Sequence, residues 1–308
     1  MIRATTRREG RLIGTATPWT SWWTLGGGTP PMGDVMLDNP DGHPYLPSHH
    51  PGPGDDMPTT RDLTFAGSTG AQLSGVLHAP EGDARGSILL AHCFTCSKDI
   101  HTMTRLADGL AESGYAALRF DFTGLGDSGG EFTDSTVSAN VRDLTSAATA
   151  LLREGYGPCG MLGHSLGGAA VLLAASKLHT VRSIAVLGAP STATHVSHLF
   201  ADVEEEVRTD GDATACIAGR EFPVSREFLD DLSAHDSQQA IAELGRPLLV
   251  IHAVDDEVVS VDEGEAIFAA AAQPKSFVPL LDTDHLVTKR AAAEQVLRHV
   301  KAWFDATL

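Results

Sequence analysis

The hexamer "GHSLGG" at residues 163–168 contains a serine whose surroundings suit a nucleophile. It follows the short apolar run 159–162 and opens a second apolar segment, 166–178, whose composition favours a helix. A serine on a very tight strand-to-helix turn projects above its sheet, and glycines at positions 163 and 167 keep Cβ atoms away from the crowded backbone. The pattern predicts Ser165 as a catalytic nucleophile. An ordinary N-cap serine is the alternative, which the flanking glycines disfavour.

A serine hydroxyl is a poor nucleophile until a base removes its proton, so a histidine and an acid are expected elsewhere. Of the 14 histidines, only His285 and His299 follow the last predicted strand, and His299 lies far along a predicted terminal helix. We therefore expect His285 to be the base. The stretch "VIHAVDDEVVS" offers Asp255 and Asp256 at the end of another predicted strand, and either carboxylate could orient the imidazole.

Composition and charge limit the partners. A net charge of −18 disfavours nucleic acid, and no apolar run approaches the roughly 18 residues of a membrane span. The opening "TTRREGRLIG" contains paired arginines, but no apolar stretch follows before Pro18, which disfavours an export signal. Four scattered cysteines make a reducing cytoplasm the simplest location. We expect a cytoplasmic protein with a small-molecule acyl substrate, no nucleic-acid or membrane partner, and self-association into a homo-oligomer left open.

The chain divides into a Gly- and Pro-rich extension and one domain. Residues 1–60 contain 9 Gly and 9 Pro, which predicts a disordered extension. From residue 61 to 308, short apolar runs alternate with longer segments of helical spacing. This alternation predicts an α/β fold: a mostly parallel eight-stranded sheet flanked by helices and opened by an antiparallel hairpin. Residues 191–244 interrupt the pattern after the sixth strand, and we expect a small cap there, with a helix over 195–208 and a hairpin over 210–224.

These motifs and their order resemble the α/β-hydrolase superfamily over residues 61–308. "HAVDDEVVS" is similar to the superfamily's His-Gly-x-x-Asp-x-x-Val-Pro pattern, which implies Asp256 as the acid and leaves Asp255 as the alternative. The backbone N–H of Leu166, after the nucleophile, is expected to bind the oxyanion. "HCFTCSKD" at residues 92–99 resembles the His-Gly-Phe loop of esterases, which implies Phe94 as the second donor. Because Cys93 replaces glycine, Cys93 stays an alternative donor.

A narrower resemblance is to the hydrolase half of bifunctional α/β-hydrolase/OsmC proteins. The OsmC domain is absent from these 308 residues, so we expect no peroxidase activity from them. The loop "RFDFTGLGDSGG" also matches a superfamily motif, in which Asp121 and its glycines organise the floor of the site. The resemblance implies a serine hydrolase that cleaves small acyl esters or thioesters through an acyl-enzyme, with no cofactor and no metal. A serine aminopeptidase-like peptidase and a non-catalytic ligand-binding protein are the alternatives.

Cys93 and Cys96 have the spacing of redox and metal-binding pairs. A zinc site would need two more ligands at matching spacing, and no second Cys-x-x-Cys exists. We expect packed, reduced thiols that shape the loop, with redox regulation of the hydrolase as the main alternative. His195 and His198, with Asp202 one turn further, could bind a metal in the cap, but lining or surface positions are the simpler interpretation.

Overall fold

The computed structural model describes residues 58–157, 159–217, 220–235 and 237–308. The predicted disordered extension lies outside these residues except for its last three positions. The first strand begins at Thr59, two residues before the predicted start of the domain.

A single eight-stranded sheet forms the centre of the described part of the chain, in the order β1-β2-β4-β3-β5-β6-β9-β10. β2 pairs antiparallel with β1 and β4, and the other neighbours pair in parallel. The predicted fold class is therefore confirmed. The strands are β1 (Thr59–Ala66), β2 (Gln72–Ala79), β3 (Ser87–Ala91), β4 (Ala116–Phe120), β5 (Cys159–His164), β6 (Val181–Leu187), β9 (Leu248–Ala253) and β10 (Lys275–Leu280).

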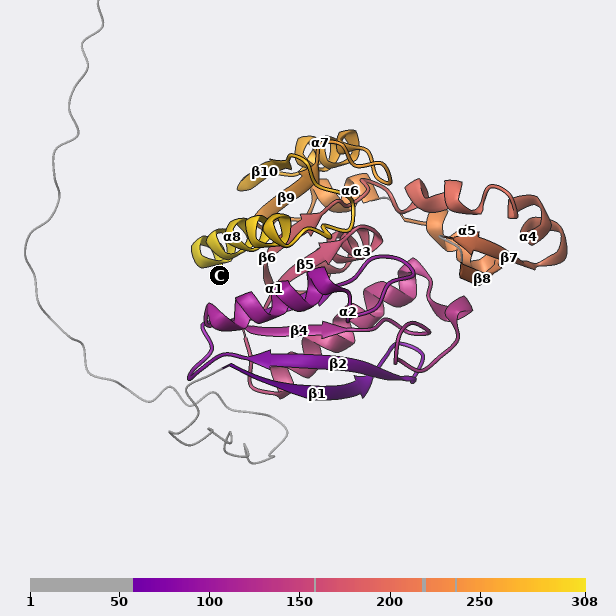
Figure 1. The fold of residues 1–308 in the computed structure, drawn as a ribbon. Helices are drawn as coiled ribbons and strands as arrows, with labels where there is room; N and C mark the ends of the chain where they lie inside the picture. Colours follow the sequence, from indigo (N-terminus) through magenta and orange to yellow (C-terminus); the bar gives the residue numbers. More distant parts are fainter. Residues whose placement is uncertain (1–57, 158, 218–219, 236) are drawn as a thin grey trace, which may run out of the picture. The chain divides into compact units, whose positions relative to one another are not determined.

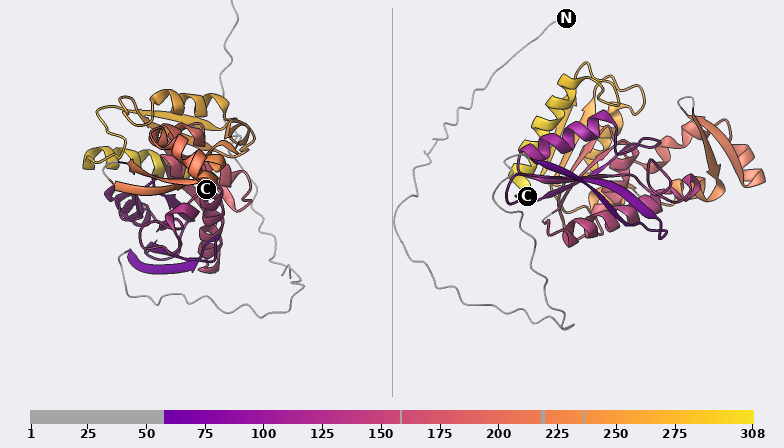
Figure 2. Two further views of the ribbon diagram at one scale, coloured as in Figure 1. Left: turned by 90° about the vertical axis from the view of Figure 1, so that its right-hand side faces the viewer. Right: turned by 60° about the horizontal axis from the view of Figure 1, so that its bottom comes forward.

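Helices cover both faces of this sheet (Figures 1 and 2). Alternate residues of β3 point to opposite faces, as in any strand, so Ile88 packs with α1 and α8 whereas Leu89 packs with α2 and α3. Every residue of α3 is buried, which explains why that segment is apolar on all sides. The helices are α1 (His101–Glu112), α2 (Val137–Arg153), α3 (Leu166–Ala175), α7 (Val261–Ala270) and α8 (Arg290–Thr307). None of the helices in the described ranges is both long and apolar enough to cross a membrane.

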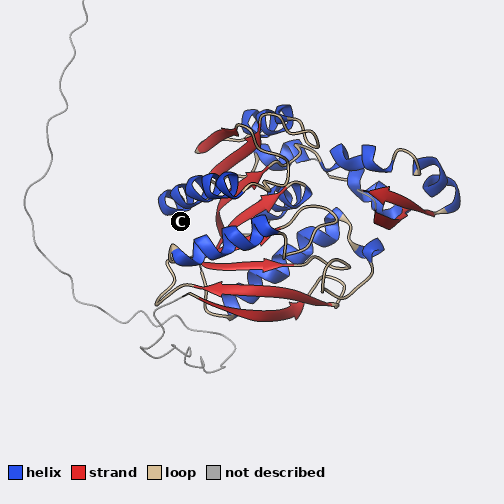
Figure 3. Ribbon diagram, in the orientation of Figure 1, coloured by secondary structure: helices blue, strands red, loops and turns tan. Residues whose placement is uncertain are grey.

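A cap is inserted between β6 and β9 and lies past the carboxyl ends of the parallel strands (Figures 1 and 3). The predicted hairpin is confirmed. The elements of the cap are η2 (Ala193–Phe200), α4 (Glu204–Asp210), β7 (Asp212–Ile217), β8 (Arg220–Ser225) and α5 (Arg226–Ser233). The next helix, α6 (Ser237–Ala242), packs against α3 and α7 (Figure 1).

The predicted single helix over 195–208 is wrong, because the chain forms the 3₁₀ segment η2 and then begins α4 at Glu204. Three glutamates fill the first turn of α4, where negative charge is favoured by the helix dipole, so a new helix start is stabilised there. Sequence reasoning also missed α5. Its signal was Ser225, which caps the helix by accepting the N–H of Phe228, ahead of buried Leu229 and Leu232.

Candidate active site

Ser165 sits on the tight turn between β5 and α3, so the predicted strand-to-helix turn is confirmed. Its φ of 55° and ψ of −127° are rare for a residue with a side chain. A Cβ at position 163 would lie 2.5 Å from the carbonyl oxygen of Gly167, and a Cβ at 167 would overlap the carbonyl oxygen of His92. Glycine is therefore required at both positions, and α3 starts in direct contact with the loop that follows β3.

Asp256 and His285, on the loops after β9 and β10, form a hydrogen-bonded pair. The Nδ1–H of His285 donates to Asp256 Oδ2 at 2.8 Å, and both side chains are nearly buried. Asp256 Oδ1 accepts the backbone N–H groups of Val258 and Val259, each at 2.9 Å. Burial raises the pKa of Asp256, but the hydrogen bonds from His285 and Val259 outweigh it and hold that pKa below its ordinary value. The carboxylate stays ionised, and Nε2 of His285 is the nitrogen left to accept a proton.

The same geometry separates the two candidate acids. Asp255 is exposed and has no hydrogen bond to His285, whereas Asp256 reaches the imidazole directly. Asp282 and Asp284 are residues of the loop that follows β10. Asp282 has a positive φ of 52°, and Asp284 accepts the hydroxyl and N–H of Thr288.

The end of β6 connects the nucleophile to the base. The N–H of Ser165 donates to the carbonyl of Leu187 at 2.9 Å. The next residue, Gly188, faces His285 closely enough that a Cβ there would lie 3.4 Å from the imidazole. Ser165 and His285 thus both lie beside the end of β6.

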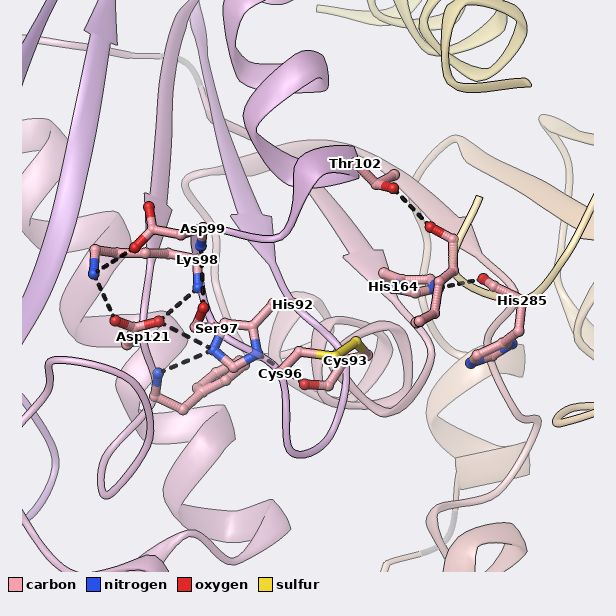
Figure 4. The surroundings of a disulfide bond; sticks show 12 residues. His92, Cys93, Cys96, Ser97, Lys98, Asp99, Thr102, Asp121, His164 and His285 are labelled. Carbon is pink, nitrogen blue, oxygen red and sulfur yellow. Dashed lines mark hydrogen bonds and ion pairs between the residues drawn. A yellow bond between two sulfur atoms is a disulfide. The ribbon is translucent and has the colours of Figure 1, made fainter. Parts of the chain in front are cut away.

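His164, directly before the nucleophile, is a site residue that sequence reasoning missed. Its buried ring donates Nε2–H to the backbone carbonyl of His285 at 2.8 Å, and the two ring centroids are 5.0 Å apart (Figure 4). Burial, followed by the nearby His285, lowers the pKa of His164 to about 3. His164 is therefore neutral at physiological pH and holds the backbone of the predicted base. The only available signal was its place between two motif residues.

His252 supports the other member of the pair in the same way. It is fully buried near Asp256, and its Nε2–H donates to the carbonyl of Val259 at 2.8 Å. Burial lowers its pKa, so it also stays neutral. This bond closes the turn whose N–H groups bind Asp256. On the far side, Thr102 of α1 donates its hydroxyl to the carbonyl of Leu286 at 2.6 Å and fixes the loop after His285.

Residues 92–98 form the loop after β3, which we call the oxyanion loop. His92, at its start, donates Nδ1–H to the carbonyl of Cys93 at 2.8 Å and accepts the N–H of Phe122 at 3.4 Å. The first turn of α3 lies against the carbonyls of Ala91 and His92, so the start of α3 and the oxyanion loop are in direct contact. These two segments carry the N–H groups of Leu166 and Phe94, which are predicted to bind an oxyanion.

Cys93 and Cys96 are joined by a disulfide, so the expected packed, reduced thiols are wrong. The reason is the turn between them: the N–H of Cys96 donates to the carbonyl of Cys93 at 3.2 Å and brings their Cα atoms to 5.3 Å, within disulfide range. Cys159 and Cys216 are free. The disulfide also removes the reason for expecting a reducing compartment, and the cellular location stays a prediction.

A buried ion pair holds the far end of the oxyanion loop (Figure 4). Asp121 is fully buried; it accepts the backbone N–H of Lys98 at 2.6 Å and its ammonium at 2.8 Å. The same ammonium donates to Asp127 at 2.6 Å. Burial alone would lower the pKa of Lys98, but its hydrogen bonds to Asp121 and Asp127 raise it well above the ordinary value. The loop that contains Asp121 and Asp127 therefore holds Lys98, the last residue of the oxyanion loop, in place.

The ring of Phe94 joins the oxyanion loop to the cap. Its centroid lies 5.9 Å from that of Phe200 and 5.7 Å from that of Phe228, both buried cap residues. Phe132, of η1 (Phe132–Asp134), packs at 5.6 Å on the same ring. The side chain of Phe94 thus belongs to an aromatic cluster, while its N–H is a separate backbone group.

A pocket of about 470 Å³ adjoins His285. Carboxylates, one lysine and two half-exposed apolar side chains form its walls. The lining residues are Asp255, Glu257, Val258, Asp282, Thr283, Asp284, His285, Leu286 and Lys289.

The histidines of the cap make local contacts. Nδ1 of His195 lies 3.5 Å from Glu263, and His198 shares a hydrogen bond of 2.6 Å with the carbonyl of His195. Over the described ranges, no cluster of three or more His, Cys, Asp or Glu is arranged to hold a metal ion.

Comparison with known proteins defines the family. The family model of serine aminopeptidases matches residues 82–210. The crystal structure of the esterase domain of a Rhodothermus marinus protein is 34% identical with a TM-score of 0.66, covering 81% of this chain and 99% of that one. Est1E from Butyrivibrio proteoclasticus, solved with ferulic acid, is 20% identical with a TM-score of 0.69 over 79% of this chain and 98% of that one, and shows the fold alone.

Among curated proteins, lysophosphatidylserine lipase ABHD12 of Danio rerio is 33% identical over 54% of this chain. The chain spans only 42% of that relative's length. The chain belongs to the α/β-hydrolase superfamily, and it is a member of the serine-hydrolase type. The narrower resemblance to α/β-hydrolase/OsmC proteins stays a prediction.

Proposed function

We propose that this chain is a serine hydrolase that cleaves small acyl esters or thioesters. The observation that carries the proposal is the buried hydrogen bond of 2.8 Å between Asp256 and His285, beside the same end of β6 to which the serine on its tight turn is bonded. The 34% identical esterase domain supports the ester class. The curated relative named as a lysophosphatidylserine lipase supports an acyl ester as substrate.

The chemistry is a double displacement. Ser165 attacks the acyl carbonyl while His285 takes its proton, and Asp256 keeps the imidazole in the required tautomer and stabilises the imidazolium. The N–H groups of Phe94 and Leu166 bind the oxyanion of the tetrahedral intermediate. His285 then protonates the leaving group, and water releases the acyl group by the same steps in reverse. The cycle needs no cofactor.

Labelling with a fluorophosphonate tests the nucleophile. The wild-type protein should be labelled and should hydrolyse p-nitrophenyl acetate, and Ser165→Ala should lose both properties. Ser176→Ala is the matched control, since Ser176 ends the same helix and its hydroxyl only bonds the carbonyl of Leu173. A wild-type protein that binds acyl ligands but is neither labelled nor active would favour a non-catalytic binding protein instead.

Peptidase action is the second candidate, because the matching family model describes serine aminopeptidases. An amide differs from an ester in its poorer leaving group, which His285 must protonate before the C–N bond breaks. Aminoacyl p-nitroanilides compared with p-nitrophenyl esters separate the two functions. We expect the ester to be the better substrate, and a higher kcat/KM for the anilide would reverse the assignment. A series from acetyl to palmitoyl esters then defines the acyl group.

A further inference from the structure

We propose that Cys93 and Cys96 are a reversible redox-modification site, and that their disulfide keeps the oxyanion loop in its active geometry. The inference rests on the proposed function, because it assigns a role to the loop that carries the N–H of Phe94. Figure 4 shows the disulfide between two groups of residues, with Lys98 and Asp121 on one side and His164 and His285 on the other.

Both ends of the oxyanion loop are fixed without the disulfide. At the start, His92 bonds the carbonyl of Cys93 and the N–H of Phe122. At the end, Lys98 bonds Asp121 through both its backbone and its ammonium. Between these anchors, the turn from residue 93 to residue 96 is spanned by the disulfide and by one backbone hydrogen bond, from the N–H of Cys96 to the carbonyl of Cys93. Oxidation or reduction of the two sulfurs therefore acts on the segment that contains Phe94.

The turn itself needs a restraint. Thr95, its third residue, has a φ of 61°, in the left-handed region that a β-branched residue rarely adopts. Glycine or asparagine is the usual choice at that place in a turn. In the oxidised protein, the covalent bond across the turn holds Thr95 in this conformation. Reduction removes this covalent restraint across a turn that contains an unfavourable φ, so the direction of the Phe94 N–H is expected to change.

The aromatic cluster extends the effect to the cap. Phe94 packs on Phe200 and Phe228, so a change in the turn also moves the surface on which the cap rests. The Cys93 side of the disulfide is buried, but Cys96 is partly exposed. Cys96 is therefore the sulfur that an external thiol or disulfide reaches first.

The chemistry is thiol–disulfide exchange with a small disulfide such as oxidised glutathione. The thiolate of Cys96 attacks one sulfur of the small disulfide, forms a mixed disulfide and releases one thiol. The thiolate of Cys93 then attacks the Cys96 sulfur, forms the internal disulfide and releases the second thiol. Two protein thiols are oxidised and one small disulfide is reduced to two thiols. Dithiothreitol reverses both steps.

The test compares the oxidised and the reduced 308-residue chain with p-nitrophenyl acetate as substrate, while alkylation and mass spectrometry report the state of each cysteine. Removing a single oxyanion donor costs about 10²–10³ in kcat, so loosening one should lower kcat by roughly tenfold on reduction, with KM changed less than about threefold. Oxidised glutathione should restore the rate. The double variant Cys93→Ser, Cys96→Ser should stay at the reduced level, and Cys216→Ser should respond like wild type.

The inference is overturned by equal kcat in the two states once alkylation shows that they interconvert, and equally by the absence of a disulfide under oxidised glutathione. Hydrogen exchange of residues 93–97 measures the turn without turnover. Protection of these amides should fall on reduction, and unchanged protection also overturns the inference. Loss of labelling and turnover in both states, with a redox-sensitive turn, would instead contradict the proposed hydrolase.

Discussion

On one side of Ser165, the oxyanion loop is held by a buried ion pair and a covalent bond, whereas on the other side neutral histidines and backbone groups hold the predicted acid and base. Lys98 and Asp121 anchor the first side. His164 and His252 support the second, and both have lowered pKa values because they are buried. The difference matters for stability. Removing the partner of a buried charge lowers the free energy of unfolding at any pH, whereas a buried neutral histidine makes that free energy depend on pH.

The largest expected effect comes from the base side. Asp256→Asn keeps the size of the side chain but removes the charge that selects the tautomer of His285, and kcat should fall by about 10⁴. Asp255→Asn is the matched variant and should cost far less, because Asp255 makes no hydrogen bond to His285. Steady-state kinetics with p-nitrophenyl acetate gives both values. Equal losses in the two variants would show that the carboxylates share the role.

On the oxyanion side, the larger effect should be on stability. Asp121→Asn leaves the buried ammonium of Lys98 without its main partner, so the free energy of unfolding should fall by about 3 kcal/mol or more. Asp127→Asn removes an exposed partner of the same lysine and should cost about 1 kcal/mol or less. Urea denaturation measures both. A loss as small for Asp121→Asn as for Asp127→Asn would mean that the ion pair does not hold the loop.

His164 tests whether a neutral donor positions the base. His164→Leu removes the hydrogen bond to the carbonyl of His285, so kcat should fall by about tenfold while KM changes little. His164→Gln supplies an amide N–H in its place and should recover most of kcat. If Gln and Leu variants lose the same amount, the ring acts through packing alone and the hydrogen bond is not needed for catalysis.

The smallest expected effect is the pH dependence of stability. The pKa of His164 in the folded protein is about 3, below the ordinary value of about 6.5 in the unfolded chain. Between these values the unfolded chain binds the proton and the folded chain does not, so stability falls as pH decreases from about 6.5. His164→Gln should lose about 1–2 kcal/mol less than wild type between pH 6.5 and 5 in urea unfolding. Identical slopes would contradict a buried neutral His164.

Short-range patterns in the sequence predicted much of this molecule. The alternation of apolar runs predicted the sheet, and the glycines around Ser165 predicted the tight turn, since both depend on local sterics. The choice between Asp255 and Asp256 needed a family resemblance, because both follow the same strand. The hydrogen bond from His164 to His285 joins residues 121 positions apart, and no local pattern encodes such a contact.

The oxyanion loop shows a second kind of feature that the sequence did not predict. The spacing of Cys93 and Cys96 allowed reduced thiols, a metal or a disulfide, and the choice depends on the turn between them, in which Thr95 has a positive φ. A threonine gives no signal for that conformation, because glycine or asparagine usually adopts it. The single helix predicted over 195–208 was wrong for a related reason. A new helix starts at Glu204, where three glutamates in the first turn interact favourably with the helix dipole.

Trapping the acyl-enzyme tests the proposed hydrolase most directly. Wild-type protein mixed with p-nitrophenyl acetate, quenched in acid within the first turnovers and digested, should carry one acetyl group on the peptide that contains Ser165, and Ser165→Ala should carry none. An acetyl group on another residue, or turnover that persists in Ser165→Ala, would contradict Ser165 as the nucleophile.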